Sequence, residues 1–230
     1  MLESLGLAAL AAATGGTALT LAWRDRGAGK ERRTARATYL DRCQTLFDTP
    51  LMGRAPTGFA RLSGTYQNRT FDIQALPDTL TFRKLPCLWL LVTIAEPMPV
   101  SSTIDIMLRP TGSETFSNFG SLPVHLDPIP GLPPEAAIRT DDPDGLPPAS
   151  VLQENLGLFA SDRVKELVIS PKGLRITFLA EEANRARYLL YRDAELGMTP
   201  LSQESLRPLL DQLVRLAATI DAASGKESLR

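Results

Sequence analysis

The residue types that most often carry acid–base or nucleophilic chemistry are sparse in this chain. His125 is the only histidine, so a serine–histidine–aspartate relay would have to use it, and no G-x-S-x-G motif is present. Cys43 and Cys87 lie far apart and lack the C-x-x-C spacing of zinc or redox sites, which predicts buried thiols outside any disulfide. The sequence therefore indicates no catalytic residue, and we expect neither a cofactor nor a metal.

Acidic side chains are the remaining candidates for chemistry. The segment TDDPDG, with Asp142 and Asp144, resembles the start of a calcium loop, but its twelfth position holds Val151 instead of glutamate, which favours a simple turn. Glu181 and Glu182 would point to opposite faces of a strand and could not act as a paired acid and base. A hydrolase or transferase would need an atypical site built from residues such as Asp141, Asp142, Arg139 and Arg175.

The N-terminal segment predicts a membrane anchor. Leu5–Trp23 is a run of about 19 uncharged residues, just long enough to cross a hydrocarbon core as a helix. A cleavable signal peptide is disfavoured because Glu3 is the only charge before the run, and a buried soluble helix because the run has no strong polar stripe. Six basic residues follow it, and they are predicted to set the topology or to face lipid: Arg24, Arg26, Lys30, Arg32, Arg33 and Arg36.

This charge asymmetry predicts orientation and partners. Basic flanks stay in the cytoplasm, so we expect a single-pass protein of the bacterial inner membrane, with its N-terminus outside and its main domain cytoplasmic. The membrane is then the first partner, and a second membrane protein could pack against the small residues Ala11, Ala12, Gly15 and Gly16. The net charge of −1 gives no overall attraction to nucleic acid.

The spacing of apolar residues changes along the chain, and it indicates which segments form the helices and strands that would position any site. Residues 24–50 combine the basic segment with an amphipathic helix that Pro50 ends. The stretch from Arg61 to Leu80 alternates around a polar turn and predicts a hairpin, and the apolar run Leu88–Ala95 predicts a strand buried on both faces. Prolines make the segment 111–148 poor in regular structure.

The C-terminal half predicts a hairpin and a long helix. The segment KELVISPKGLRITFLAEE has Pro171 and Gly173 where a β-turn favours them, RARYLLYRDA offers a further strand, and apolar residues from Leu206 to Ile220 follow a helical period. The predicted fold class is α+β, with an N-terminal transmembrane helix, then an antiparallel β-sheet domain with a packed C-terminal helix. The expected divisions are an anchor (1–23), a basic and helical segment (24–50), an α+β domain (51–222, with 61–110 and 137–220 as alternative halves) and a flexible tail (223–230).

Several short segments together carry a resemblance. SGTYQNRTFDI, the buried strand, IRTDDP, LVISPKGLRITF and the leucine-rich helix resemble a broad class of uncharacterised bacterial membrane-anchored proteins over residues 60–220. The resemblance implies a bacterial inner-membrane setting and no particular activity.

Two functions of different classes follow from these observations. The first is a membrane-anchored interaction or scaffold protein that presents its sheet and helices to another protein. The second is the hydrolase or transferase with the atypical acidic site. The first is favoured because no nucleophile, base and orienting group can be assembled from local signals.

Overall fold

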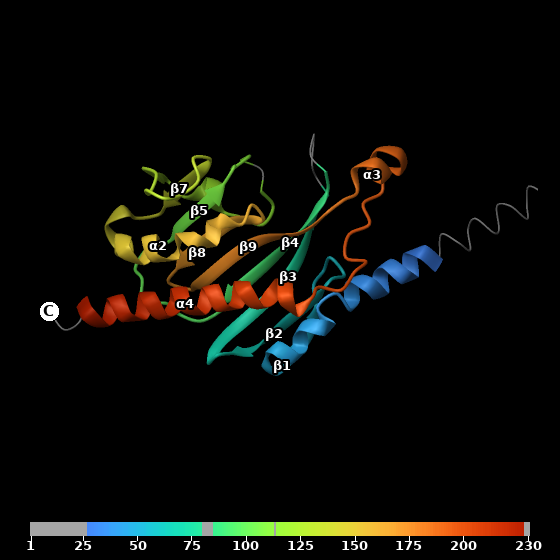
Figure 1. The fold of residues 1–230 in the computed structure, drawn as a ribbon, viewed down its shortest axis with the longest axis horizontal. Coiled ribbons are helices and arrows are strands. Elements are labelled where there is room, and N and C mark those ends of the chain that lie inside the picture. The colour runs from blue at the N-terminus through green and yellow to red at the C-terminus, as the bar shows by residue number, and fades with distance from the viewer. Residues whose placement is uncertain (1–26, 80–84, 113, 228–230) are drawn as a thin grey trace, which may run out of the picture.

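The strands of the chain form one antiparallel sheet. The computed structural model describes residues 27–79, 85–112 and 114–227, and its nine strands follow the order β1-β2-β3-β4-β9-β8-β5-β7-β6 (Figure 1). The strands are β1 (Asp48–Arg54), β2 (Ala60–Tyr66), β3 (Arg69–Asp78), β4 (Cys87–Ile94), β5 (Ile104–Leu108), β6 (Val124–Leu126), β7 (Ala136–Thr140), β8 (Val164–Ser170) and β9 (Gly173–Glu182). The helices are a first helix over 27–37, then α2 (Ala149–Asn155), α3 (Arg185–Tyr191) and α4 (Gln203–Glu227), with 3-10 segments η1 (Asp41–Leu46), η2 (Phe119–Ser121), η3 (Pro143–Gly145) and η4 (Leu156–Ala160).

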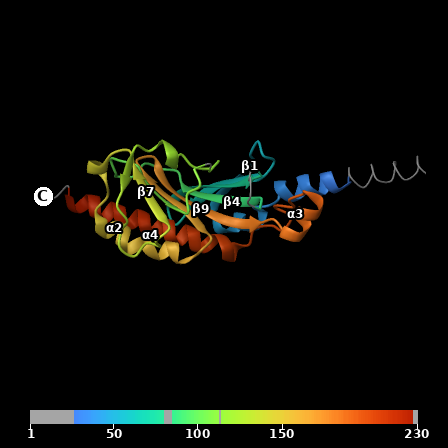
Figure 2. The ribbon, with the colours of Figure 1, turned by 90° about the horizontal axis from the view of Figure 1, so that it is seen from above.

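Helix α4 covers one face of this sheet, as Figures 1 and 2 show. Its apolar stripe, which includes Leu206, Leu210 and Leu213, is buried and joins the main core with Leu174 and Ile176 of β9. The Ser202 hydroxyl accepts a hydrogen bond from the Ser205 backbone N–H at 3.3 Å and so caps the start of the helix. The predicted packing of the terminal helix against the β8–β9 hairpin is confirmed.

Both predicted hairpins form through turns whose sequence suits them. Gln67 and Asn68 connect β2 to β3 with φ of 46° and 63°, the pair of left-handed residues that a two-residue hairpin turn needs. Gly173 closes the β8–β9 turn with φ of 146°, where an added Cβ would lie 2.1 Å from the Ile94 carbonyl oxygen. Glycine is therefore required at position 173 by both conformation and space.

The apolar run is a central strand, as predicted. β4 lies between β3 and β9, and Leu88, Leu90, Val92 and Ile94 are fully buried against the main core. The alternate side chains of β4 face the other side of the sheet, where Trp89 and Leu91 pack in a second, smaller apolar cluster. Strands from 61–110 and from 137–220 pair with each other, so the two alternative halves contribute to one sheet.

The membrane-anchored part of the predicted fold class needs correction. The predicted span, Leu5–Trp23, and the small residues Ala11, Ala12, Gly15 and Gly16 lie outside the described residues. Within the described part of the chain, no helix is both long enough and apolar enough to cross a membrane. The longest, α4, has 25 residues, but charged side chains alternate with its buried stripe. This finding overturns the transmembrane fold class, the single-pass and signal-anchor predictions and the inner-membrane location, with its N-terminus outside and cytoplasmic domain.

Two local predictions also change. Residues 185–191, predicted as a strand, form helix α3, because the Asn184 side chain accepts the Arg187 backbone N–H at 3.0 Å and caps a helix start. Both edges of β9 are already paired with β4 and β8, so the segment that follows has no free edge there. The amphipathic helix predicted before Pro50 is split between the helix over 27–37 and η1, although Cys43 is buried as its pattern required.

Candidate functional site

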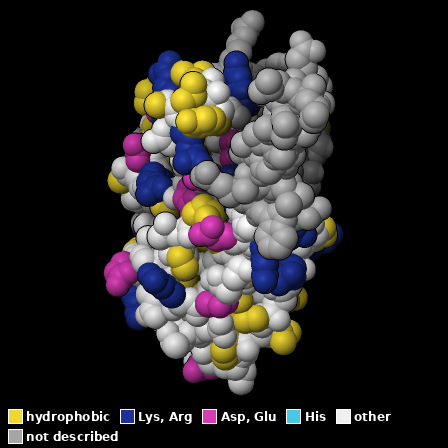
Figure 3. All heavy atoms as spheres, turned by 90° about the vertical axis from the view of Figure 1, so that its right-hand side faces the viewer, with side chains coloured by type: hydrophobic (Ala, Val, Ile, Leu, Met, Phe, Trp, Pro, Cys, Tyr) yellow, Lys and Arg dark blue, Asp and Glu magenta, His cyan; other side chains and the backbone are white. Residues whose placement is uncertain are grey.

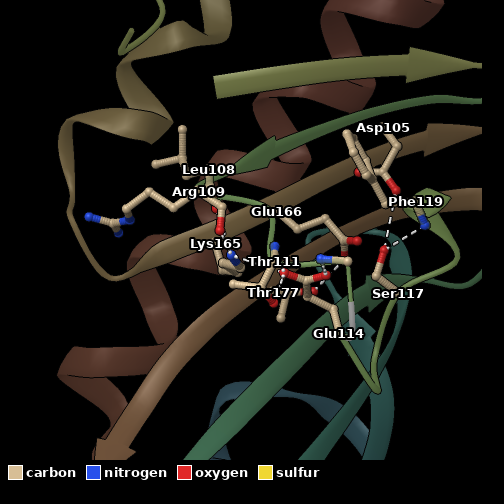
Figure 4. Close-up of polar contacts among 11 residues, drawn as sticks. Asp105, Leu108, Arg109, Thr111, Glu114, Ser117, Phe119, Lys165, Glu166 and Thr177 are labelled. Carbon is tan, nitrogen blue, oxygen red and sulfur yellow. Dashed lines mark hydrogen bonds and ion pairs between the residues drawn. The ribbon is translucent and has the colours of Figure 1, made fainter. Parts of the chain in front are cut away.

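Polar side chains are buried on the face of the sheet turned away from α4. Because Leu167 and Ile176 point into the main core, the alternation of their strands places Glu166 of β8 and Thr177 of β9 on the opposite face. Asp105 of β5 lies on the same face, one strand further along. The exposed fraction of Asp105 is 2%, and Glu166 and Thr177 are fully buried. Figure 4 shows how these side chains lie.

Residues 109–112 and 114–123 cover these polar groups; we call them the covering loop. Its Glu114 carboxylate accepts the backbone N–H of Thr111 at 2.6 Å and lies 3.5 Å from the Lys165 ammonium. Lys165 also donates to the carbonyl oxygens of Leu108 and Arg109, at 2.6 and 2.7 Å. These contacts, drawn in Figure 4, close the first half of the loop onto β8.

Aromatic side chains hold the second half of the covering loop. The ring centroids of Phe116 and Trp89 are 5.0 Å apart, and the Arg139 guanidinium lies 5.3 Å from the centre of the Phe119 ring. Arg139 also donates to the carbonyl oxygens of Gly120 and Leu122, both at 3.1 Å. Both halves of the loop are therefore held by contacts of its described residues, which shield the polar groups beneath them.

Asp105 and Glu166 form a buried acid pair. Glu166 Oε2 accepts hydrogen bonds from the Thr177 hydroxyl at 2.8 Å and the Arg175 guanidinium at 3.2 Å, and Asp105 Oδ2 accepts one from the Ser117 hydroxyl at 3.4 Å. The other oxygens of the pair, Asp105 Oδ1 and Glu166 Oε1, are buried without an N–H or O–H donor among the described residues. Burial, followed by the charge of Glu166, raises the pKa of Asp105 to about 8. At neutral pH the Asp105 carboxyl group is therefore mostly protonated, and its O–H adds a donor to a site where both remaining oxygens lack one among the described residues.

This proton could serve general acid–base chemistry only where a substrate reaches it. The covering loop and the sheet enclose both carboxyl groups almost completely. In this structure the acid pair is a buried part of the sheet beneath the covering loop, and the geometry does not present it to a substrate.

The acidic residues chosen from sequence have other roles. Asp141 Oδ1 accepts the Thr103 backbone N–H at 2.7 Å, which joins the end of β7 to the start of β5. Asp142 accepts the Asp144 backbone N–H at 3.0 Å and caps the turn at η3. Arg139 on β7 and Arg175 on β9 share a face of the sheet but are separated by β5 and β8, about 14 Å at normal strand spacing. The four residues do not converge on one site.

The acid pair was missed because strand alternation alone cannot show a covered face. Asp105 lies between Ile104 and Ile106, and Glu166 directly follows Lys165; charged residues at such strand positions ordinarily indicate a solvent-facing side of a sheet. The available signal was the two phenylalanines, Phe116 and Phe119, in a loop otherwise read as irregular.

Of the residues considered for nucleophilic chemistry, His125 is exposed on β6, and burial raises the pKa of the Cys43 thiol to about 11.

The predicted basic group is divided in the structure. Arg24 and Arg26 lie outside the described residues, and Lys30 and Arg33 are exposed on the first helix. Arg32 makes a two-point ion pair with Asp193 and also lies 3.3 Å from Glu195. The Arg36 guanidinium lies 5.3 Å from the centre of the Phe59 ring.

The ion pairs of Arg32 fix the base of a projecting helix. They tie the first helix to the segment after α3, and Arg187 of α3 pairs with Glu195 of the same segment. The Glu181 carboxylate accepts the Gly197 backbone N–H at 2.8 Å, which anchors this segment to β9. Figure 1 shows α3 standing off the end of the sheet, above the segment that leads from it back to α4.

The last three residues of α3 are exposed apolar side chains, which we call the α3 tip. The exposed fractions of Leu189, Leu190 and Tyr191 are 57%, 72% and 66%. Leu51 on β1 is similarly exposed, at 70%, but stands alone. Figure 3 shows hydrophobic side chains grouped at the α3 end of the molecule with Lys and Arg side chains beside them. A group of adjacent apolar residues on a surface marks a contact site more strongly than one isolated leucine.

Comparison with known proteins adds no family. No family model and no curated protein matches the sequence. A crystal structure of the mycobacterial trehalose monomycolate transport factor A, TtfA, is similar with a TM-score of 0.37 and 10% identity, covering 86% of this chain and 94% of that one. At this TM-score the likeness carries no argument about function.

Proposed function

We propose that this protein is a non-catalytic interaction module that contacts its partner through the α3 tip. The observation that carries the proposal is the run of three consecutive exposed apolar residues, Leu189 to Tyr191, on a helix that stands off the sheet. Removing exposed apolar side chains from water is favourable in free energy, so association with a partner that covers them is favoured.

The base of α3 supports this role because it is held in place before any partner binds. Arg32, Asp193, Arg187 and Glu195 form a connected set of ion pairs beneath the helix. A surface that is already ordered loses less conformational freedom on binding than a flexible one. The acid pair, in contrast, is enclosed, which favours an interaction module over an enzyme.

Coverage of the α3 tip in living cells can be measured with a thiol-reactive, membrane-permeant maleimide. In the full chain with Leu190→Cys, we expect the new thiol to react at least tenfold more slowly inside cells that make the protein than after purification, because the partner covers it. Leu51→Cys is the matched control, since Leu51 is equally exposed but isolated, and its rate should change little. Cys43 and Cys87 are buried and contribute little background. Equal ratios for positions 190 and 51 would contradict the proposed function.

A further inference from the structure

We infer that the partner of the α3 tip is an anionic lipid surface, an inference that rests on the proposed function and names its ligand. The apolar tip would enter the headgroup layer, and the basic side chains around it would contact lipid phosphates. Such a contact is one-sided and requires no membrane-spanning segment.

Charge is the first argument for this partner. The Arg32–Asp193 ion pair joins the first helix to the segment 185–195. These two segments together carry seven basic and three acidic residues, whereas the whole chain has a net charge of −1. Two of the three acids, Asp193 and Glu195, are already paired with arginines. The exposed basic residues of this end are Lys30, Arg33, Arg185, Arg187 and Arg192. Basic side chains at this density favour an anionic surface.

The arrangement of side chains is the second argument. Arg187 lies 5.9 Å from the centre of the Tyr191 ring, and Arg192 lies 6.0 Å from that of Tyr188. Leu189 and Leu190 thus stand between two tyrosines in the sequence, and each tyrosine ring has a guanidinium group beside it. This order, from apolar to aromatic to cationic, matches the change from acyl chains to headgroups across a lipid interface.

The same features disfavour two protein partners. A second copy of this chain would bring the arginines of two α3 helices together, and like charges would repel across a symmetric contact. The tip offers only three side chains, a few hundred Å² of surface, whereas a standard protein interface buries about 800 Å² on each partner. A lipid surface accepts a small convex apolar tip without any minimum matching area.

Vesicle binding tests this inference at the tip itself. The full chain with Leu190→Cys is labelled with an environment-sensitive fluorophore and mixed with vesicles of phosphatidylglycerol or of phosphatidylcholine. We expect the emission to shift to the blue and to increase with phosphatidylglycerol, and to change at least tenfold less at the same concentration of phosphatidylcholine. The same fluorophore on Leu51→Cys should remain exposed to water with both vesicles. A response at position 190 alone therefore distinguishes binding through the α3 tip from binding through another part of the chain.

Charge and apolar contact are then tested separately in the labelled protein. Combined Arg185→Gln and Arg192→Gln should weaken the phosphatidylglycerol signal about tenfold at low salt, whereas Arg54→Gln with Arg215→Gln, also exposed but elsewhere, should leave it within twofold. Leu189→Ser should weaken it by a similar factor. Unchanged melting temperatures would exclude misfolding as the cause.

The outcomes separate this inference from the proposed function. If the label at position 190 reports water with both vesicles, or responds equally to both, the lipid assignment is wrong. If that result is accompanied by coverage of Leu190→Cys inside cells, a protein holds the tip and the interaction role stands. If position 190 is also uncovered inside cells, both proposals fail.

Discussion

Replacing Leu213 by aspartate is expected to lower the melting temperature of the full chain by about 10 °C or more. Leu213 is fully buried in the stripe of α4 that packs on the sheet. The substitution removes a buried leucine, which ordinarily costs about 2 to 5 kcal/mol, and adds a carboxylate without a partner, which costs more. Each kcal/mol corresponds to about 2 to 4 °C in a domain of this size.

The control lies two positions along the same helix. Arg215 is exposed, so Arg215→Asp introduces the same side chain at a solvated site and should shift the melting temperature by only one or two degrees. Thermal melts followed by circular dichroism compare the two variants directly. Similar melting temperatures would show that α4 does not dock on the sheet, against the packing described above.

Features determined by neighbouring residues could be predicted from the sequence. The β2–β3 turn requires only that Gln67 and Asn68 tolerate left-handed backbone, and the burial of β4 follows from an apolar run bounded by prolines. The stripe of α4 repeats often enough for its period to be unambiguous. In each case local preference and tertiary packing favour the same structure.

Features determined by distant parts of the chain could not be predicted. RARYLLY has the composition of a strand, but the Asn184 cap and the lack of a free edge at β9 make it a helix, and its apolar residues become the exposed α3 tip. Asp105 and Glu166 occupy positions typical of a solvated face, and only the folding of the covering loop encloses them. The candidate sites thus arise where tertiary structure overrides local pattern, which single-sequence reasoning does not detect.

The acid pair should make stability depend on pH in an unusual direction. The pKa of Asp105 is raised from its ordinary value near 3.8 to about 8, so the folded protein binds this proton more tightly than the unfolded chain does. The stabilisation is complete at acidic pH and is lost as pH rises through the folded pKa, with a slope of at most about 1.4 kcal/mol per pH unit. We expect the melting temperature to fall by several degrees between pH 5 and about 8, and then to level off with respect to this group.

Asparagine at position 105 isolates the contribution of this proton. In Asp105→Asn the amide keeps the shape of the carboxyl group, supplies N–H donors where the protonated acid supplies an O–H, and does not titrate. The decline of the melting temperature between pH 5 and 8 should therefore become much shallower, and the variant should be more stable than the natural chain at pH 8. Asp162→Asn, at an exposed position, should keep the original slope, which accounts for other titrating groups. If the slope survives Asp105→Asn unchanged, the proton does not reside on the acid pair, and Asp105 must be charged beneath the covering loop.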